Sequence, residues 1–490
     1  MSASPVRRTR IVATLGPATD ADGMLERILR EGVDVVRLNL SHGTAADHEK
    51  RADAVRAVAQ EIGCEVGVLA DLQGPKIRVE RFSNGAVILQ PGQPFTLDCR
   101  KDAPPGDETR VGVSYLGLIN DVQSGDVLLL DDGLIALQVR EVAGDQIHCI
   151  VLIGGKLSDR KGLNRQGGGL SLGALSDKDR ADIKLAAHLR ADFLAVSFVR
   201  SAADIEETRT LLHEAGGAAA IVAKIERAEA IDALEGIVDA ADAVMVARGD
   251  LGVEIGDAEL PGLQKKIIRE ALIRNRAVIT ATQMLQSMVE APIPTRAEVL
   301  DVANAVIDGT DAVMLSQETA AGKHPDKAVA AMRRVCLGAE RQFEPTEDMS
   351  PAAHRIDRSD QAIAMSAMFL AARVGVRAII ALTESGSTAQ WLSRFRSKVP
   401  IYALSRSAAA RRRMLLLRDV TPVAFDPAND GDPAHVARAA VQLLFSQNVL
   451  SVGDLVLLTH GDHTGRGGGT NTLKLLHVGE DGIAESLRDL

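Results

Sequence analysis

The segment AAIVAKIERAEAIDALEGIVDAADAVMVARGDLGVEIGDAELPGLQKKIIREALIRNRAVITAT, residues 219–282, decides the fold class. It contains three short aliphatic runs, Ala219–Ile225, Ala243–Val246 and Ala277–Thr282, separated by longer amphipathic stretches such as Leu260–Arg274. Short aliphatic runs that alternate with amphipathic helices are typical of buried parallel strands. The segment therefore predicts consecutive β/α units.

Further aliphatic runs extend this pattern to eight strands: Ile11–Leu15, Val33–Leu40, Val66–Leu72, Phe193–Val199 and Ala312–Leu315. Helical stretches are expected between them at Asp20–Glu31, His48–Ile62, Asp177–Leu189 and Ala202–Ala215. Eight β/α repeats predict a TIM (β/α)8 barrel. A doubly wound open sheet is the alternative.

The barrel pattern is interrupted between Gly74 and Arg165. Short alternating segments separated by Gly, Asp and Pro turns occupy this stretch: Ala86–Leu89, Pro94–Leu97, Val127–Leu130, Ile135–Val139 and Gln146–Leu152. They predict a small all-β domain inserted into a βα loop. Such loops lie at the catalytic end of a barrel, so we expect the insert to act as a lid.

A polar stretch with two prolines, Phe343–Asp360, predicts a linker to a C-terminal α/β domain. In that domain we expect a helix at Gln361–Val374 and strands at Ala378–Leu382, Ile401–Leu404, Thr421–Phe425 and Leu455–Thr459. The predicted domains are the barrel at 1–73 and 166–342, the inserted β-barrel lid at 74–165 and the C-terminal domain at 343–490.

The composition fits a soluble protein with an aliphatic core, because aromatic residues make up only 2% of the 490 residues. The formal net charge of −10 argues against nucleic acid as a partner. The cysteines show no C-x-x-C spacing and are expected to be reduced thiols. The polar, basic segment Met1–Arg10 carries no secretory signal, and no apolar run is long enough for a membrane span. We therefore expect a cytoplasmic protein without a membrane partner.

Charged or hydroxyl side chains end six of the proposed barrel strands: Arg37, Asn39 and Ser41; Asp71; Lys224 and Glu226; Arg248 and Asp250; Thr282; Ser316 and Glu318. A buried strand carries a charge at a cost unless that charge is paired or used. One such residue could be a structural ion pair. Six strands that end in this way predict one site at the mouth of the barrel.

The residue types indicate the chemistry of this site. Glu226 and Asp250 are hard oxygen ligands suited to Mg²⁺, with Mn²⁺ as an alternative. Arg37, Lys224 and Arg248 supply positive charge for phosphate or carboxylate, although an internal ion pair is an equal interpretation of Arg248. No G-x-x-x-x-G-K-[ST] motif is present, which argues against a Walker-type nucleotide site. The residues alone indicate a Mg²⁺-dependent barrel enzyme that acts on a small phosphorylated acid.

Seven segments, in this order, give the chain a specific resemblance to the pyruvate kinase family over essentially its whole length: RRTRIVATLGPATD (Arg7–Asp20), VVRLNLSHG (Val35–Gly43), DLQGPKIR (Asp71–Arg78), KIERAEA (Lys224–Ala230), MVARGDLGVE (Met245–Glu254), ITATQMLQSM (Ile279–Met288) and DAVMLSQETAAGKHP (Asp311–Pro325). The resemblance implies transfer of the phosphoryl group of phosphoenolpyruvate to ADP, which gives pyruvate and ATP in glycolysis. It also implies a homotetramer.

The resemblance implies that Glu226 and Asp250 bind the divalent metal. Lys224 would neutralise charge on the transferring phosphoryl group and on the nascent enolate oxygen, and Arg37 would hold the phosphate.

The carboxylate would be held by Thr282 and by the backbone amides of Gly249 and Asp250. Thr282 and Ser316 match the positions of a hydroxyl and water relay that protonates the enolate. A hydroxyl bonded to the backbone is the alternative interpretation of Ser316.

ADP would lie between the barrel and the lid. Matching positions are Pro17, His42, Arg78 and Lys161, and for His42 a loop-capping role is the alternative. Closure of the lid would exclude water, which competes with ADP for the phosphoryl group.

One departure from the family pattern concerns K⁺. Many members have Glu where this chain has Lys76, and they hold K⁺ with groups that match Asn39, Ser41, Asp71 and the Leu72 carbonyl. Members with Lys work without K⁺, because an ammonium group can replace the charge of the bound cation. We therefore expect no requirement for K⁺. A solvated loop lysine is the alternative.

The segment TESGSTAQ, Thr383–Gln390, follows a strand and opens a helix, where N–H groups and hydroxyls can bind an anion. The family places an effector's phosphate here. We expect a phosphorylated sugar or AMP to activate the enzyme through Thr383, Ser385, Gly386, Ser387 and Thr388, with Thr464–Thr472 closing over it. A capped helix with nothing bound is the alternative.

Two other functions compete with phosphoryl transfer. A phosphoenolpyruvate mutase or lyase would share the metal and the cations, but would have no use for Arg78, Lys161 and the lid. A metabolite-sensing protein that has kept the fold would be expected to lose groups such as Lys224 and Glu226.

Overall fold

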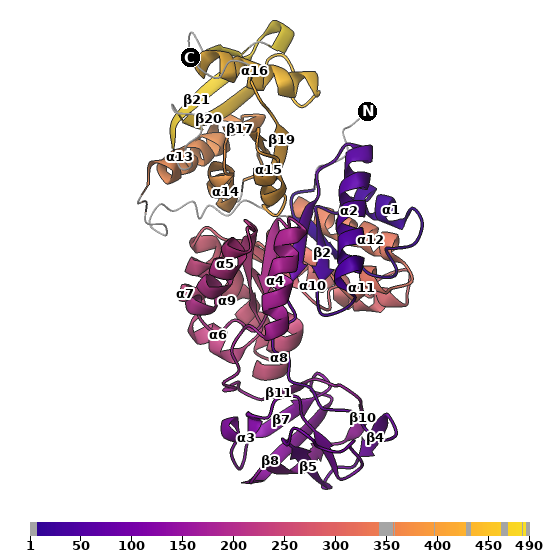
Figure 1. The fold of residues 1–490 in the computed structure, drawn as a ribbon. Helices are drawn as coiled ribbons and strands as arrows, with labels where there is room; N and C mark the ends of the chain where they lie inside the picture. The colour runs from indigo at the N-terminus through magenta and orange to yellow at the C-terminus, as the bar shows by residue number, and fades with distance from the viewer. Residues whose placement is uncertain are drawn as a thin grey trace.

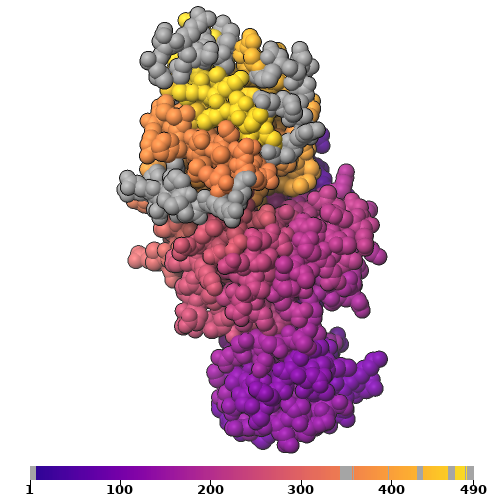
Figure 2. Space-filling view, turned by 90° about the vertical axis from the view of Figure 1, so that its left-hand side faces the viewer, coloured from indigo at the N-terminus to yellow at the C-terminus, as the bar shows by residue number. Residues whose placement is uncertain are grey.

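The structure is a computed structural model that describes residues 7–342, 356, 358–395, 397–427, 433–461, 469–482 and 484–486. Figure 1 shows a β-rich lobe at the bottom, a barrel surrounded by helices in the middle and an α/β lobe at the top. In Figure 2 the three lobes pack end to end as one elongated body. The expected fold class is confirmed: a (β/α)8 barrel with an all-β lid and a C-terminal α/β domain.

Eight parallel strands close the barrel in the order β1-β16-β15-β14-β13-β12-β3-β2. Because β1 is paired with both β16 and β2, the barrel sheet has no free edge, and the open-sheet alternative is wrong. The strands are β1 (Arg10–Thr14), β2 (Val35–Asn39), β3 (Gly67–Asp71), β12 (Phe193–Val196), β13 (Ala220–Ile225), β14 (Ala243–Ala247), β15 (Ala277–Ala281) and β16 (Ala312–Leu315). Each expected aliphatic run overlaps one of these strands.

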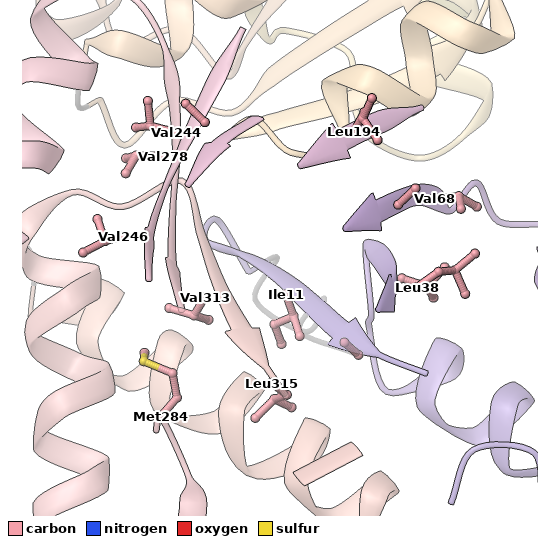
Figure 3. Packing of buried hydrophobic residues seen from close by; sticks show 14 of the residues in the cluster. Ile11, Leu38, Val68, Leu194, Val244, Val246, Val278, Met284, Val313 and Leu315 are labelled. Carbon is pink, nitrogen blue, oxygen red and sulfur yellow. The ribbon is translucent and has the colours of Figure 1, made fainter. Parts of the chain in front are cut away.

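Helices cover the outside of the barrel. They are α1 (Met24–Arg30), α2 (Ala45–Ile62), α4 (Asp177–His188), α5 (Ala202–Glu214), α6 (Ala228–Asp232), α7 (Leu234–Ala240), α8 (Arg248–Ile255), α9 (Leu260–Ile273), α10 (Arg296–Asp308), α11 (Gln317–Ala320) and α12 (Pro325–Arg341), with the 3₁₀ turn η1 (Gln286–Val289). Figure 3 shows strand residues such as Leu38, Val68 and Leu315 in the buried layer between strands and helices. None of the helices in the described parts of the chain is long and apolar enough to cross a bilayer.

The inside of the barrel shares one apolar cluster with the C-terminal domain. Barrel residues such as Val12, Leu69 and Met245 belong to the same buried cluster as Leu416 and Leu417. The ends of the strands that lie away from the lid therefore rest on side chains of the C-terminal domain. Burial of this apolar surface stabilises the two domains together.

The lid contains a six-stranded sheet, β11-β7-β8-β9-β5-β6, and a two-stranded sheet, β10-β4. Its elements are β4 (Ala86–Leu89), β5 (Pro94–Asp98), β6 (Arg110–Gly112), α3 (Leu118–Asp121), β7 (Val127–Leu130), β8 (Ile135–Ala143), β9 (Gln146–Ile153), β10 (Gly155–Ser158) and β11 (Leu163–Arg165). The chain returns to the barrel through Gly167, Gly168 and Gly169, whose φ values are 82°, 75° and 89°. Glycine adopts this backbone without the strain of a Cβ atom.

The C-terminal domain is built on the sheet β19-β18-β17-β20-β21-β22. Its elements are α13 (Ser359–Val374), β17 (Ala378–Leu382), α14 (Ser387–Arg394), β18 (Ile401–Ser405), α15 (Ala408–Met414), β19 (Val420–Ala424), α16 (Pro433–Ser446), β20 (Leu455–Gly461), β21 (Thr470–Val478), the 3₁₀ turn η3 (Glu480–Gly482) and β22 (Ala484–Ser486). The first four strands in this order of the sheet are parallel, and β21 and β22 are antiparallel. Most of the expected linker at Phe343–Asp360 lies outside the described residues.

Candidate active site

A buried network of charged groups lies where β2, β3 and β13 end. The Lys224 ammonium lies 2.8 Å from Glu226 Oε1 and 3.2 Å from Asp71 Oδ1, and donates to Ser197 Oγ at 2.7 Å. Arg37 Nε donates to Asp71 Oδ2 at 2.6 Å. The side chains of Arg37, Asp71, Lys224 and Glu226 thus converge from three strands, as the sequence predicts for the barrel mouth.

The charges of this network support one another. Burial alone would lower the pKa of Lys224, but Asp71 and Glu226 outweigh that effect and raise it above its usual value. Burial would raise the pKa of Asp71, but Lys224 and Arg37 together lower it. The lysine is therefore held as an ammonium group at the mouth, where it can stabilise negative charge that develops on a substrate.

Glu226 and Asp250 lie close enough for the charge of Asp250 to act on Glu226. Burial raises the pKa of Glu226, Lys224 opposes the shift, and the nearby charge of Asp250 adds to it. Two carboxylates that repel each other at a cationic rim are a donor set that fits Mg²⁺, which needs few protein ligands and keeps other positions for substrate oxygens. Among the residues that the structure describes, no group of three or more His, Cys, Asp or Glu forms a denser metal cluster.

Asp250 is held from the lid side by a residue far away in the sequence. Lys76 Nζ donates to Asp250 Oδ1 at 2.9 Å and lies 3.8 Å from Asp132 Oδ1 in the lid. The Lys76 side chain is only 22% exposed. It is therefore not the solvated loop lysine of the alternative interpretation.

Thr282 and Gly249 meet at the end of β15. Thr282 has a φ of 66°, unusual for a β-branched residue. Its Oγ1 accepts the Gly249 N–H at 2.8 Å and donates to the Ala281 carbonyl at 2.7 Å. A strained backbone that is held in place by its surroundings often marks a functional position.

Two further residues of the predicted cluster have different environments. Arg248 pairs with Asp301 at 2.7 Å and donates to the Thr282 carbonyl at 2.6 Å, so its guanidinium is used internally. Ser316 Oγ is buried and has no hydrogen-bond partner among the described residues, and the alternative of a hydroxyl bonded to backbone is wrong. Glu318 accepts the backbone N–H groups of Leu285 and Ser316 and fixes this corner.

The residues matched to ADP lie on the rim and on the lid. Pro17 and His42 are exposed on barrel loops, and the His42 carbonyl accepts from His48 Nε2 at 2.9 Å. Arg78 Nη1 donates to the Arg160 carbonyl at 2.9 Å. Lys161 pairs with Asp131 at 2.7 Å, inside the lid.

The groups matched to K⁺ ligands form hydrogen bonds or ion pairs with other groups of the protein. Asn39 Oδ1 accepts the Ser41 N–H at 3.2 Å, and the Leu72 carbonyl accepts from Ser197 Oγ at 2.8 Å. Asp71 is paired with Arg37 and Lys224. Among the described residues, the Lys76 ammonium pairs with Asp250 and lies near Asp132.

The expected effector loop joins β17 to α14. Gly386 has a φ of 92° and its N–H donates to Thr383 Oγ1 at 2.9 Å. Ser385 Oγ lies 3.3 Å from Ser387 Oγ, and Thr388 Oγ1 lies 2.6 Å from Thr470 Oγ1 in a buried contact. The expected closing segment Thr464–Thr472 lies partly outside the described residues, because 462–468 are not described.

Sequence reasoning missed three residues of the mouth. Ser197 bridges Lys224 and the Leu72 carbonyl, Thr14 accepts from Arg37 Nη1 at 3.1 Å, and the Phe198 N–H donates to Glu226 Oε2 at 2.8 Å. Phe198 adopts a φ of 55°. The aliphatic run predicts a strand over all of Phe193–Val199, whereas β12 ends at Val196, so the Ser197 hydroxyl lies just beyond the strand end.

The fold and the site define a (β/α)8-barrel enzyme whose mouth gathers carboxylates and cationic side chains next to a lid, a class suited to phosphoryl transfer. The family profile "Pyruvate kinase, barrel domain" matches residues 6–329, and "Pyruvate kinase, alpha/beta domain" matches 361–476. The chain belongs to the pyruvate kinase family. It is a phosphotransferase of that family, whose substrates are phosphoenolpyruvate and ADP.

Individual relatives agree with this assignment. The chain is 53% identical over 481 residues to pyruvate kinase II of Salmonella typhimurium, with 96% of this chain and 99% of that protein covered. It is 50% identical over 464 residues to pyruvate kinase of Haemophilus influenzae, with coverages of 93% and 96%. A crystal structure of a pyruvate kinase from Cryptosporidium parvum has a TM-score of 0.90 and 33% identity, covering 96% of each chain.

Proposed function

We propose that the network around Lys224 carries out the transfer. The observation that carries this proposal is the Lys224 ammonium, which is held between Asp71 and Glu226 with a raised pKa. A fixed positive charge of this kind stabilises the transferring phosphoryl group and the enolate oxygen that it leaves. Arg37, which Asp71 orients, binds the phosphate of phosphoenolpyruvate.

Glu226 and Asp250 would hold Mg²⁺, or Mn²⁺ in its place. When bound, the ion neutralises charge on the substrate oxygens. Thr282 and the amides of Gly249 and Asp250 position the substrate carboxylate. The carboxylate would then accept hydrogen bonds at the N-terminus of α8, and the Gly249 N–H would exchange its bond to Thr282 Oγ1 for one to the substrate.

The enolate must be protonated at carbon to give pyruvate. Ser316 Oγ is free to donate, since it is buried without a partner among the described groups, and Thr282 Oγ1 lies at the same mouth. A hydroxyl with its ordinary acidity needs a water or a second group to replace its proton. We assign Thr282 and Ser316 to such a relay.

ADP would bind between Pro17 and His42 on the barrel rim and Arg78 and Lys161 at the lid. Lid closure would bring Lys161 toward the barrel, and the glycines of the return segment, Gly167–Gly169, would permit that movement. The closed lid would exclude water from the phosphoryl group.

We further propose activity without K⁺, because the Lys76 ammonium supplies a positive charge at the mouth. A coupled assay of pyruvate formation, with tetramethylammonium or KCl at equal ionic strength, tests this point. Equal rates are expected. A Lys76→Glu variant should gain a requirement for K⁺, and activity of the unmodified enzyme only with K⁺ would refute the proposal.

The loop Thr383–Thr388 would bind the phosphate of a phosphorylated sugar or of AMP. Its support is the set of hydroxyls and the N-terminus of α14. Titration of each ligand at subsaturating phosphoenolpyruvate should lower the half-saturating substrate concentration, and Ser387→Ala should weaken the response. No shift with either ligand would defeat this assignment. We also propose a cytoplasmic homotetramer, the domain boundaries at 73/74, 165/166 and 342/343, and the absence of nucleic-acid and membrane partners.

A further inference from the structure

Lys76 occupies the point where the lid meets the barrel mouth. It lies in the segment that leaves β3 for the lid, and the backbone of the returning segment packs against it, since a Cβ atom on Gly162 would lie 3.0 Å from Lys76 Cε. The Lys76 side chain therefore packs against the segment in which the chain returns from the lid. Its position is set by packing and not by charge alone.

The ammonium group of Lys76 faces carboxylates from both sides. Asp250 Oδ1 on the barrel lies 2.9 Å away and Asp132 Oδ1 on the lid 3.8 Å away. The Asp132 side chain is 73% exposed and its φ of 53° turns it out of the regular strand, at the β7–β8 turn.

Asp132 has a neighbour with a similar backbone and a different partner. Asp131, with a φ of 52°, pairs with Lys161 at 2.7 Å within the lid. Asp131 therefore forms an ion pair within the lid, whereas Asp132 lies near the Lys76 ammonium at the barrel mouth. Substitution of Asp131 is therefore a matched control for substitution of Asp132.

We infer that Lys76 is a positioning residue that couples occupancy of the carboxylates Glu226 and Asp250 by a divalent ion to the position of the lid. It pairs with Asp250 when that carboxylate is free, and it pairs with Asp132 when Asp250 holds the ion. The inference rests on the proposed role of Asp250 as a metal ligand. It goes beyond the replacement of K⁺, because it concerns the lid and the affinity for the divalent ion.

The physical basis is competition for one carboxylate. A divalent cation and an ammonium group on one carboxylate repel each other, so an ion bound to Asp250 weakens the Lys76–Asp250 pair and favours release of the ammonium. The nearest carboxylate that can receive the displaced ammonium is Asp132, and pairing with it draws the lid turn toward the mouth. Lys76 therefore weakens binding of the ion, and Asp132 offsets part of that weakening.

Direct titration of the full-length enzyme with MnCl2 by calorimetry, without phosphoenolpyruvate or ADP, tests the competition. Lys76→Met should bind Mn²⁺ on the order of tenfold more tightly than the unmodified enzyme. Asp132→Asn should bind it more weakly, and Asp131→Asn should leave the affinity unchanged. Equal or weaker binding by Lys76→Met would overturn the inference, as would equal effects of the two aspartate variants.

Amide hydrogen exchange at residues 127–139 tests the movement of the lid. Mn²⁺ should slow exchange there in the unmodified enzyme and in Asp131→Asn, but not in Lys76→Met or Asp132→Asn. The same slowing in Asp132→Asn would overturn the inference. Neither measurement needs turnover, so a failure here is distinct from a failure of the enzyme to form pyruvate in the coupled assay.

Discussion

Arg394 of the C-terminal domain forms a buried, two-pronged ion pair with Asp311, the residue that precedes barrel strand β16. Arg394 Nη1 lies 2.9 Å from Asp311 Oδ2, Nη2 bonds to Oδ1, and both side chains are at most 2% exposed. Asp311 also accepts the backbone N–H groups of Val278 and Arg418, each at 3.0 Å. One carboxylate therefore ties two barrel strands to the C-terminal domain.

Replacement of Arg394 by Met should destabilise the protein by about 3–5 kcal/mol, because it leaves the Asp311 carboxylate buried without its cation. Thermal and urea unfolding measure this change. Arg30→Met is the control, since the exposed Arg30–Glu26 pair should contribute at most about 1 kcal/mol. A small effect at both positions would contradict the importance of the buried pair.

Glu254 should make stability depend on pH near neutrality. Burial raises the pKa of Glu254 from 4.5 to about 7, against the hydrogen bond from the Ala228 N–H and the charge of Arg227. A folded-state pKa above the unfolded value favours the protonated form, so its contribution is fully present below pH 4.5 and is lost as the pH rises through about 7.

The Glu254→Gln variant should therefore gain about 3 kcal/mol relative to the unmodified enzyme between pH 5 and pH 8. Denaturant unfolding at a series of pH values measures the difference. Glu61→Gln, at an exposed position on α2, should show no such trend. Parallel stability curves for Glu254→Gln and the unmodified enzyme would disprove the assignment.

Lys224→Met should reduce kcat by on the order of a thousandfold or more, because the stabilising charge at the transferring group is lost. It should also lower the melting temperature, since Asp71 and Glu226 then lose their shared cation. A second variant, Lys224→Met with Glu226→Gln, should recover stability without recovering rate. An unchanged kcat in the single variant, despite its lower melting temperature, would mean that Lys224 has only a structural role.

Ser316→Ala separates function from stability cleanly. Because Ser316 Oγ has no partner among the described groups, its removal breaks no hydrogen bond, and stability should change by no more than about 0.5 kcal/mol. Exchange of the methyl hydrogens of pyruvate in D2O, which reports protonation at carbon, should fall by on the order of a hundredfold. Unchanged exchange would remove Ser316 from the proton relay.

The barrel could be predicted from the sequence because its strands are short, aliphatic and buried on both faces, as in Val244 and Val246 of β14. Polar residues at the carboxyl ends of the predicted strands then placed Arg37, Asp71, Lys224 and Glu226 at the barrel mouth. These features depend on local composition and on the periodicity of a closed barrel. They do not require knowledge of side-chain conformations.

Other features were not accessible in this way. Asp250 was expected at a strand end but lies in the first turn of α8, because the helix begins at Arg248 directly after β14 without a connecting loop. Strand β21, TNTLKLLHV, went unnoticed because its polar and apolar residues alternate irregularly. The Lys76–Asp250 contact joins residues 174 positions apart and depends on where the lid lies, which no local pattern encodes.

The barrel strands pack against the C-terminal domain through the apolar cluster that the barrel interior shares with it. Val222 and Ile279 rest in this cluster, while Lys224 and Thr282 stand a few residues further along the same two chain segments. If the C-terminal domain tilted slightly, it would push on the strand ends that lie in this cluster. The opposite strand ends, which carry Lys224 and Thr282, would then move as well. The buried cluster thus links the C-terminal domain directly to the strands that carry Lys224 and Thr282.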